Sequence, residues 1–303
     1  MTILDGRLGS DAPAPGPVGD VPRPAPLPGR LETLEREVAV ALGSPARLGV
    51  AFSGGVDSSV LLALAVRSLG AHRTLAILGV SPSLAADERT AAHAVAARIG
   101  VPLVEVVTHE ADIPAYRANG PDRCFHCKNE LFTRISDEVA ARFGVTAVAY
   151  GENADDAGRP DRPGAGAAAR HDVLRPLASA GVTKIDVRAL ARALDLPSAD
   201  KPAAPCLASR IPHFEEVTPA KLAQVEIAER GLRDLGFADS RVRHHGDVAR
   251  IELTEEDLVR ATGAELRGQV HRAVTAAGFR FVTLDLAGIQ SGAFTLPLVS
   301  VRA

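Results

Sequence analysis

The chain has 303 residues, a formal net charge of −3 and a hydrophobic content of 46%. This length favours two domains, and the charge gives no case for a nucleic-acid partner. No apolar run approaches the length of a membrane span, and we expect no secretory signal at the start. Three cysteines, an odd number, argue against a disulfide framework and favour a cytoplasmic protein with functional thiols.

The first segment is rich in Pro, Gly and Ala over residues 1–30. Such a composition cannot build a core, so we expect a disordered tail. Residues 31–42 then form the pattern of an amphipathic helix. We expect this helix to lead into the first domain.

A short apolar run over residues 48–52 predicts a buried strand, and residues 60–69 predict a helix. Between them lie two glycines and several hydroxyl groups, which suit a phosphate at a helix N-terminus. Asp57 can help hold Mg²⁺. The spacing is not that of a Walker A loop, and the alternative is a tight turn with incidental serines. The candidate ATP-binding residues are Ser53, Gly54, Gly55, Val56, Asp57, Ser58 and Ser59.

Strands and helices then alternate along the chain. Strands are expected at 74–80, 103–107 and 145–150, and helices at 85–99 and 130–143. This order predicts a Rossmann-like α/β fold, with a parallel sheet covered by helices on both faces. Ligands of such folds bind at the carboxyl ends of the strands, where the Ser53–Ser59 loop is expected to lie.

The polar stretch 151–156 follows another strand and offers carboxylates for a metal or a substrate; the alternative is a solvated acidic turn. Residues 159–172 are rich in Gly, Pro and Ala and are expected to form a mobile loop. Thr183 opens a capping-box helix that runs to Leu194.

A second, smaller α/β domain is expected from residue 197 onward. Its pattern predicts a helix after Thr218, strands at 241–245 and 248–253, a helix after Thr254 and a last strand at 279–286. The predicted division is therefore a tail at 1–30, an ATP-binding domain at 31–196 and a C-terminal domain for substrate, sulfur transfer and oligomerisation at 197–303.

The three cysteines form a CxxC pair, Cys124 and Cys127, and a distant Cys206. A CxxC pair is a common ligand pair for zinc, with His126 or His213 to complete the site, or for an iron–sulfur cluster. Three thiolates would leave one iron of a four-iron cluster without a protein ligand. The alternative is two near-surface thiols and one core cysteine.

Arg241 and Arg243 alternate along a predicted strand and so share one face. Two adjacent guanidinium groups suit a phosphate or a carboxylate. The alternative is a solvated strand face.

These stretches together resemble a known family. The SGGVDSS loop resembles that of the PP-loop ATP pyrophosphatases, and over roughly residues 31–292 the chain resembles the LarE family of ATP-dependent sulfur transferases, which act in nickel-pincer nucleotide biosynthesis. The stretches that carry this second resemblance are DRCFHCK at 122–128, CLASRIP at 206–212, RVRHH at 241–245, ARIE at 249–252 and TLDL at 283–286.

The resemblance implies that ATP adenylates a carboxylate of pyridinium-3,5-biscarboxylic acid mononucleotide and that sulfur then displaces AMP. Cys206 matches the sulfur-donor position, and Asp57 belongs to the catalytic loop. The three-cysteine pattern resembles that of members with a [4Fe-4S] cluster, and a homotrimer or a dimer of trimers is implied. The residues that match substrate positions are Arg241, Arg243, Ser209, Glu229 and Glu252.

Two other functions remain open at this point. One is another PP-loop ligase, which amidates its substrate or thiolates tRNA, although no glutaminase domain or basic RNA-binding extension is evident. The other is a module without catalysis that senses ATP or redox state through its CxxC pair. Release of pyrophosphate separates an enzyme from such a sensor.

Overall fold

The structure is a computed structural model that describes residues 25–157 and 164–290. Its larger sheet has four parallel strands in the order β3-β2-β1-β4. Most of the expected tail, residues 1–24, lies outside the described residues. The strands are β1 (Leu48–Ala51), β2 (Thr74–Val80), β3 (Leu103–Val107) and β4 (Ala147–Tyr150).

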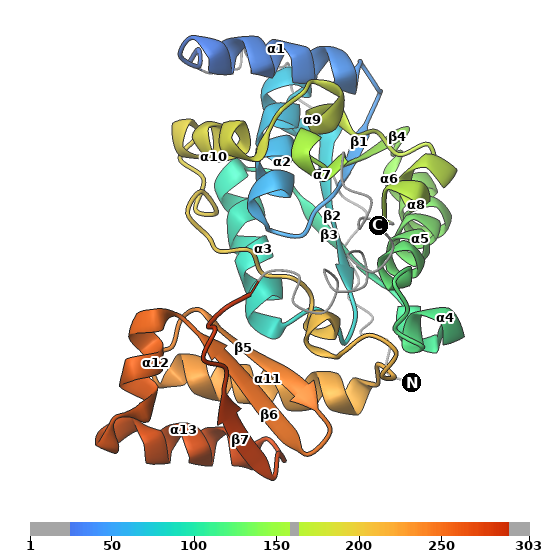
Figure 1. Ribbon diagram of the computed structural model, residues 1–303. Coiled ribbons are helices and arrows are strands. Elements are labelled where there is room, and N and C mark those ends of the chain that lie inside the picture. The colour runs from blue at the N-terminus through green and yellow to red at the C-terminus, as the bar shows by residue number, and fades with distance from the viewer. Residues whose placement is uncertain (1–24, 158–163, 291–303) are drawn as a thin grey trace, which may run out of the picture.

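Helices cover both faces of this sheet, as predicted (Figure 1). Alternation along β2 explains the two layers, because successive side chains of a strand point to opposite faces. Ala76 and Leu78 pack with α1, α2, α3 and α10, whereas Leu75 and Ile77 pack with α5 and α8. The helices of this part are α1 (Arg30–Leu42), α2 (Val56–Leu69), α3 (Ala86–Ile99), α4 (Pro114–Arg117), α5 (Arg123–Arg134), α6 (Ala141–Phe143), α7 (Ala154–Ala157), α8 (Gly164–Arg170), α9 (Pro176–Ser179) and α10 (Lys184–Ala193).

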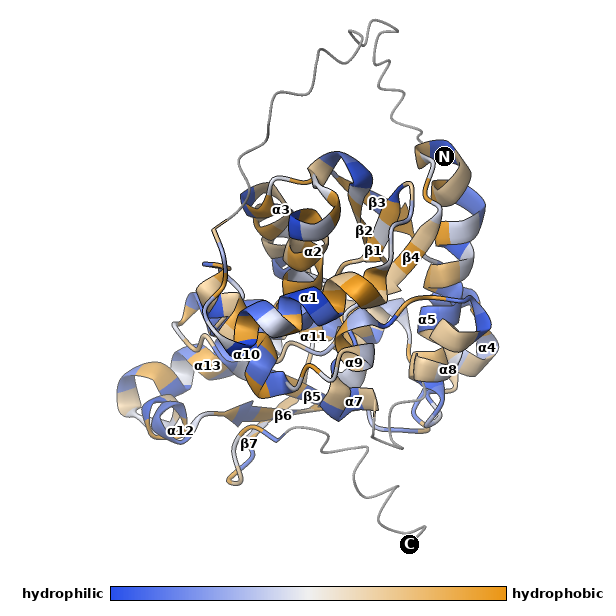
Figure 2. Cartoon of the chain, turned by 90° about the horizontal axis from the view of Figure 1, so that it is seen from above, coloured by the Kyte–Doolittle hydropathy of each residue, from blue (hydrophilic) through white to orange (hydrophobic). Residues whose placement is uncertain are grey.

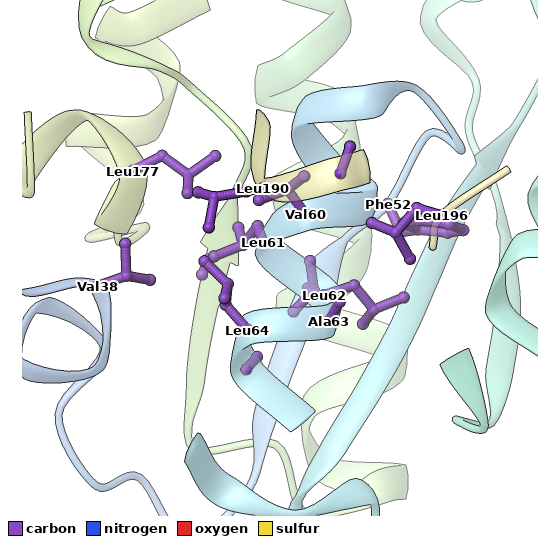
Figure 3. Packing of buried hydrophobic residues seen from close by; sticks show 14 of the residues in the cluster. Val38, Phe52, Val60, Leu61, Leu62, Ala63, Leu64, Leu177, Leu190 and Leu196 are labelled. Atoms are coloured by element: carbon purple, nitrogen blue, oxygen red, sulfur yellow. The ribbon is translucent and has the colours of Figure 1, made fainter. Parts of the chain in front are cut away.

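The central helix α2 is buried on nearly all sides. Val60, Leu61, Leu62 and Leu64 are each at most 1% exposed, and Figure 3 shows them in one cluster with Leu190 of α10 and Leu177 of α9. Figure 2 shows the mainly hydrophobic strands enclosed by helices whose outer sides are more hydrophilic. This packing fixes the start of α2, whose first turn contains the second half of the Ser53–Ser59 loop.

The C-terminal part has its own sheet and its own apolar cluster. Strands β5 and β6 form an antiparallel hairpin, and β7 joins β6 in parallel. The turn at Gly246-Asp247 is where the sequence predicted it. The elements are α11 (Pro219–Asp234), β5 (Ser240–His245), β6 (Val248–Leu253), α12 (Glu255–Thr262), α13 (Ala264–Ala276) and β7 (Phe281–Leu284).

Three helix starts follow the predicted caps. The Thr183 hydroxyl accepts a hydrogen bond from the Asp186 amide, and the Asp186 carboxylate accepts one from the Thr183 amide. The hydroxyls of Thr218 and Thr254 cap α11 and α12 in the same way. The domain boundary at residue 197 stays a prediction.

Two elements differ from the expectation. Residues 164–170, expected to lie in a mobile loop, form helix α8; the earlier part of that segment, 158–163, lies outside the described residues. Alanine is the best helix former, and Ala167 and Ala168 are fully buried in the cluster that also contains Phe132 of α5. Tertiary packing thus outweighs the low helix propensity of Gly164 and Gly166.

Helix α5 also begins seven residues earlier than expected, at Arg123 instead of residue 130, and so contains the whole CxxC pair. Arg123, the residue that opens the helix, is buried. A charged residue on the inner face hides the apolar periodicity from which the helix start was predicted. None of the described helices is long and apolar enough to span a membrane.

Candidate active site

The Ser53–Ser59 loop joins β1 to α2 at the carboxyl end of the parallel sheet (Figure 1). Gly54 has a φ of 73°, and a Cβ atom there would lie 2.9 Å from the Cα atom of Ala92 in α3. Glycine is therefore required both by backbone conformation and by the close approach of a neighbouring helix. The loop has the glycine and the helix N-terminus that a phosphate site needs.

The serines of the loop hold its shape. The Ser59 hydroxyl donates to the Gly55 carbonyl over 2.8 Å, and the Ser58 hydroxyl lies 3.2 Å from that of Ser53. Ser58 and Ser59 are buried, whereas Ser53 is exposed. Ser53 therefore presents its hydroxyl to solvent at the position where a phosphate would bind.

Asp57 is held by two residues that lie far from it in the sequence. The Asn153 amide donates to Asp57 Oδ1 over 2.8 Å, and the Lys184 ammonium lies 2.5 Å from Oδ2. Strand β4 reaches this helix closely, since a Cβ atom on Gly151 would lie 2.7 Å from the Ser58 nitrogen. The first turn of α2, the turn after β4 and the start of α10 thus form one site.

Lys184 was missed by the sequence reasoning. It is the first residue of α10, where the helix dipole disfavours a cation. A lysine at such a position, next to a capping box, is a signal that an anion lies nearby. The structure supplies this anion as Asp57, and the lysine is equally well placed for a phosphate.

The acidic stretch 151–156 is partly buried. Glu152 is 4% exposed, and one of its carboxylate oxygens lies 3.3 Å from an Arg175 nitrogen. Asn153 is also buried and bonds to Asp57 and Asp156. Asp155 alone is exposed, and it accepts a hydrogen bond from the Lys184 amide. The stretch is therefore an ordered wall of the loop site.

The hairpin β5–β6 buries charged side chains. Arg243 makes two hydrogen bonds to Glu252, of 2.8 and 2.7 Å, across the hairpin, and both residues are at most 3% exposed. Arg210 pairs with Glu229 in the same manner, at 2.8 and 3.2 Å. The alternative of a solvated strand face is therefore wrong.

Arg241 lies beside these pairs with different partners. It is 5% exposed and donates to the carbonyls of Gln290, over 2.9 Å, and Ala203, over 3.2 Å. Burial, together with the charges of Arg210 and Arg243, lowers the pKa of its guanidinium. Among the described residues no carboxylate lies within ion-pair distance of Arg241, so its charge is available to an anionic ligand.

Arg210, Arg241 and Arg243, with Glu229 and Glu252, form a group that we call the cationic cluster. The turn that carries Cys206 is bonded to this cluster. Arg243 donates to the Ser209 carbonyl over 2.9 Å, and Arg210 donates to the Ser209 hydroxyl over 3.0 Å. The Leu207 amide also donates to the Ser83 carbonyl, just beyond β2, over 2.9 Å. Because β2 is the neighbour of β1, Cys206 lies at the same edge of the sheet as the Ser53–Ser59 loop.

The three thiols come from two elements. Cys124 and Cys127 are one turn apart in α5, on one side of the helix, and Cys206 precedes the 3₁₀ turn Leu207–Arg210. Cys124 and Cys206 are exposed and Cys127 is half-buried. Burial raises the pKa of the Cys127 thiol well above its ordinary value, and the charges of Glu110, Cys206 and Cys124 raise it further. Cys127 also packs against the apolar cluster that contains Leu207 and Ala208, the two residues directly after Cys206.

The position of the CxxC pair corrects one expectation. The sequence predicted a helix only from residue 130, but both thiols of the pair lie in α5, which begins at Arg123. Within residues 25–157 and 164–290, no three His, Cys, Asp or Glu side chains are placed to hold a single metal ion. This arrangement does not support a preformed zinc site with His126 or His213. A four-iron cluster has a different requirement, because each thiolate ligates a different iron.

A parallel sheet with a glycine- and serine-rich loop at the end of its first strand defines the class of PP-loop ATP pyrophosphatases. A family model described as asparagine synthase matches residues 30–155. The chain is 40% identical to the uncharacterized protein slr1717 of Synechocystis sp. over 88% of this chain and 97% of that protein. It is 35% identical to the pyridinium-3,5-bisthiocarboxylic acid mononucleotide synthase of Lactiplantibacillus plantarum, over 86% of this chain and 94% of that enzyme.

The chain belongs to the family of this synthase, the LarE family. The uncharacterized protein MJ0830 of Methanocaldococcus jannaschii is 27% identical over 78% of the chain. ATP binding follows from the class, and the role of the Ser53–Ser59 loop in it stays a prediction.

The exposures of the thiols predict their order of alkylation. In reduced, metal-free protein, iodoacetamide should modify Cys124 and Cys206 before Cys127, because Cys127 is half-buried and its thiol pKa is raised. The rate at Cys127 should still increase above pH 9, since its thiolate population still grows there. Mass spectrometry of the peptides measures each rate. Modification of Cys127 as fast as that of Cys206 at pH 8 would contradict the placement of α5.

Proposed function

We propose that the protein is an ATP-dependent sulfur transferase, which adenylates the carboxylates of pyridinium-3,5-biscarboxylic acid mononucleotide and converts them to thiocarboxylates. The 35% identity to the synthase supports this substrate. The observation that carries the proposal is the hydrogen bond from the Leu207 amide to the Ser83 carbonyl, which holds the Cys206 turn at the edge of the sheet where the ATP loop lies.

The first step is adenylation. The amides and hydroxyls of the loop bind the β- and γ-phosphates, and Asp57 binds Mg²⁺ together with the phosphates. One or two carboxylates plus substrate phosphates are the usual ligand set of Mg²⁺, so the residues present fit this ion. Lys184 shifts from Asp57 to the phosphates. A carboxylate oxygen of the substrate then bonds to the α-phosphorus as the bond to pyrophosphate breaks.

The cationic cluster binds the substrate. Arg241, whose guanidinium has carbonyl partners, takes the phosphate of the mononucleotide, with Arg243 beside it. Glu252 and Glu229 hold Arg243 and Arg210 in place, and Ser209 sits between these two arginines. Charge-assisted hydrogen bonds of this kind fix an anion in both position and orientation.

The second step transfers sulfur. A sulfur nucleophile attacks the acyl carbon, the bond from that carbon to the AMP oxygen breaks, and AMP leaves. If Cys206 is the donor, its Sγ forms a thioester with the acyl carbon; loss of the Cα proton then breaks the Cβ–Sγ bond, so that Cys206 becomes dehydroalanine and the thiocarboxylate is released. Otherwise Cys124, Cys127 and Cys206 would hold a [4Fe-4S] cluster, which would supply sulfide for the transfer. Cys127 packs against the apolar cluster that contains Leu207 and Ala208, the two residues after Cys206, and this proximity supports such a ligand set.

The resemblance also leads us to propose a homo-oligomer, a trimer or a dimer of trimers. We also propose a cytoplasmic location, because the reaction consumes ATP and needs reduced thiols.

Loss of the Asp57 carboxylate should stop adenylation. We expect Asp57→Ala to lower substrate-dependent release of pyrophosphate about 10²–10³-fold, because preorganised charge at the phosphates is lost. Ser53→Ala should act in the same direction. Asp195→Ala, which removes an exposed acid at the far end of α10, is the matched control. Nucleotide binding without release of pyrophosphate by the wild type would instead indicate a sensor.

Removal of the Arg241 guanidinium should weaken binding of the mononucleotide and leave binding of ATP unchanged. We expect Arg241→Ala to raise the KM for the mononucleotide about ten- to hundredfold, which corresponds to roughly 1.5–3 kcal/mol for a charge-assisted contact. Arg230→Ala, an exposed arginine of α11, should leave this KM unchanged. An equal rise in the KM for ATP would place Arg241 in the nucleotide site.

Removal of the CxxC thiols should separate the two sources of sulfur. If Cys124 and Cys127 hold a cluster, then Cys124→Ala and Cys127→Ala, purified without oxygen, should each lose iron and form at most one thiocarboxylate per chain. If both variants transfer sulfur as the wild type does, and Cys206 is converted to dehydroalanine, Cys206 is the sacrificial donor and the cluster is excluded. Iron analysis and mass spectrometry of the protein measure both outcomes.

A further inference from the structure

Asn119 is a fully buried residue that lies between α4 and α5, outside the site described above. Its φ is 56°, in the left-handed region that few residues other than glycine adopt. Asparagine tolerates this conformation when its side chain finds local hydrogen bonds. Such a strained backbone conformation persists only when contacts with the surrounding structure stabilise it.

The side-chain nitrogen and the backbone carbonyl of Asn119 both bond to residues that lie about 90 positions further along the chain. The Asn119 Nδ2 donates to the carbonyls of Ile211, over 3.2 Å, and Pro212, over 2.7 Å. Its backbone carbonyl accepts hydrogen bonds from the Phe214 amide, over 3.1 Å, and from the His213 ring, over 3.0 Å. One residue thus binds four consecutive residues of the segment that follows Cys206.

Arg123 completes the contact from the first turn of α5. It is 8% exposed, donates to the Ala208 carbonyl over 2.9 Å, and donates to Asn119 Oδ1 over 2.5 Å. Arg123 is the residue directly before Cys124, and Ala208 lies two residues after Cys206.

A peptide contact continues the same attachment at its far end. The Val217 amide donates to the Arg117 carbonyl over 2.9 Å. The segment 208–217 is therefore fastened along the segment 117–123 at both ends, and the Asn119–Arg123 pair supplies the buried contacts in the middle.

We propose that Asn119 and Arg123 are positioning residues for sulfur transfer, which hold the turn of Cys206 against the helix of Cys124 and Cys127. Without this pair the Cys206 segment loses its buried hydrogen bonds to α5 and no longer keeps its thiol near the other two. The role in sulfur transfer rests on the proposed function, whereas the geometric role does not.

The test measures the approach of two thiols directly. A short bismaleimide reagent joins Cys124 to Cys206 by addition of each thiol to one maleimide, and both thiols are exposed. The substitution Asn119→Gly keeps the left-handed backbone at no steric cost and removes only the amide. We expect this variant to form the Cys124–Cys206 cross-link about tenfold more slowly than the wild type in reduced, metal-free protein, because the effective concentration of one thiol near the other falls.

Asp195→Gly is the matched control, because Asp195 also has a positive φ, 51°, and lies on the surface at the end of α10. It should cross-link as the wild type does. Arg123→Lys, which keeps a charge but not the fork of donors, should slow the cross-link in the same direction as Asn119→Gly. If Asn119→Gly yields no folded protein, Asn119→Asp decides instead, because it keeps the acceptor for Arg123 and loses the donor to Ile211 and Pro212.

Activity gives the second measurement. Asn119→Gly should lose thiocarboxylate formation at least about tenfold while its release of pyrophosphate stays close to that of the wild type, since the ATP loop is elsewhere. A wild-type rate of cross-linking in Asn119→Gly, or in Asn119→Asp where that variant decides, would overturn the proposal. Absence of pyrophosphate release from the wild type would overturn the proposed function and leave the cross-linking result to decide the role of Asn119.

Discussion

The burial of five charged side chains beside one hairpin is the constraint on which the site depends. Arg210, Arg241, Arg243, Glu229 and Glu252 are all at most 6% exposed. Arg210 and Arg243 are paired with Glu229 and Glu252, and removal of one partner from a buried ion pair typically costs about 3–5 kcal/mol. These two arginines therefore have few alternative positions. Because Arg210 and Arg243 also bond to Ser209, the turn of Cys206 inherits their fixed geometry.

The ATP loop depends on a different constraint, the close packing of three chain segments at one edge of the sheet. Gly54 lies against Ala92, and Gly151 lies against the backbone of Asp57 and Ser58. The charge of Asp57 is balanced by Lys184 from the start of α10. The Ser53–Ser59 loop and the turn of Cys206 are thus held by separate sets of contacts, and the hydrogen bond from Leu207 to Ser83 attaches the turn to the end of β2.

Local patterns in the sequence predicted much of the fold. The four parallel strands, the hairpin turn at Gly246-Asp247 and the caps at Thr183, Thr218 and Thr254 all follow from alternation, turn residues or short-range hydrogen bonds. The failures have a common cause. Helix α8 and the early start of α5 depend on burial against distant segments, and neither the inward face of Arg243 nor the approach of Lys184 to Asp57 is encoded within a few residues. The candidate residues were found by motif, but their pairing was not.

Asn119 shows that sequence motifs alone do not identify the residues that position the Cys206 thiol. It lies outside the CxxC pair and outside the segment from Cys206 to Pro212, yet it bonds to that segment and lies shortly before the helix that carries the CxxC pair. A thiol on a short turn has no regular hydrogen-bond ladder to hold it, so its position must come from side chains that reach the backbone of that turn. Arg243 reaches it from the hairpin, Arg123 reaches it from the start of α5, and Asn119 reaches it from the segment between α4 and α5. Contacts from two sides thus fix the turn relative to both the buried arginines and the CxxC thiols, and the sulfur transfer that we propose needs Cys206 to be placed relative to both.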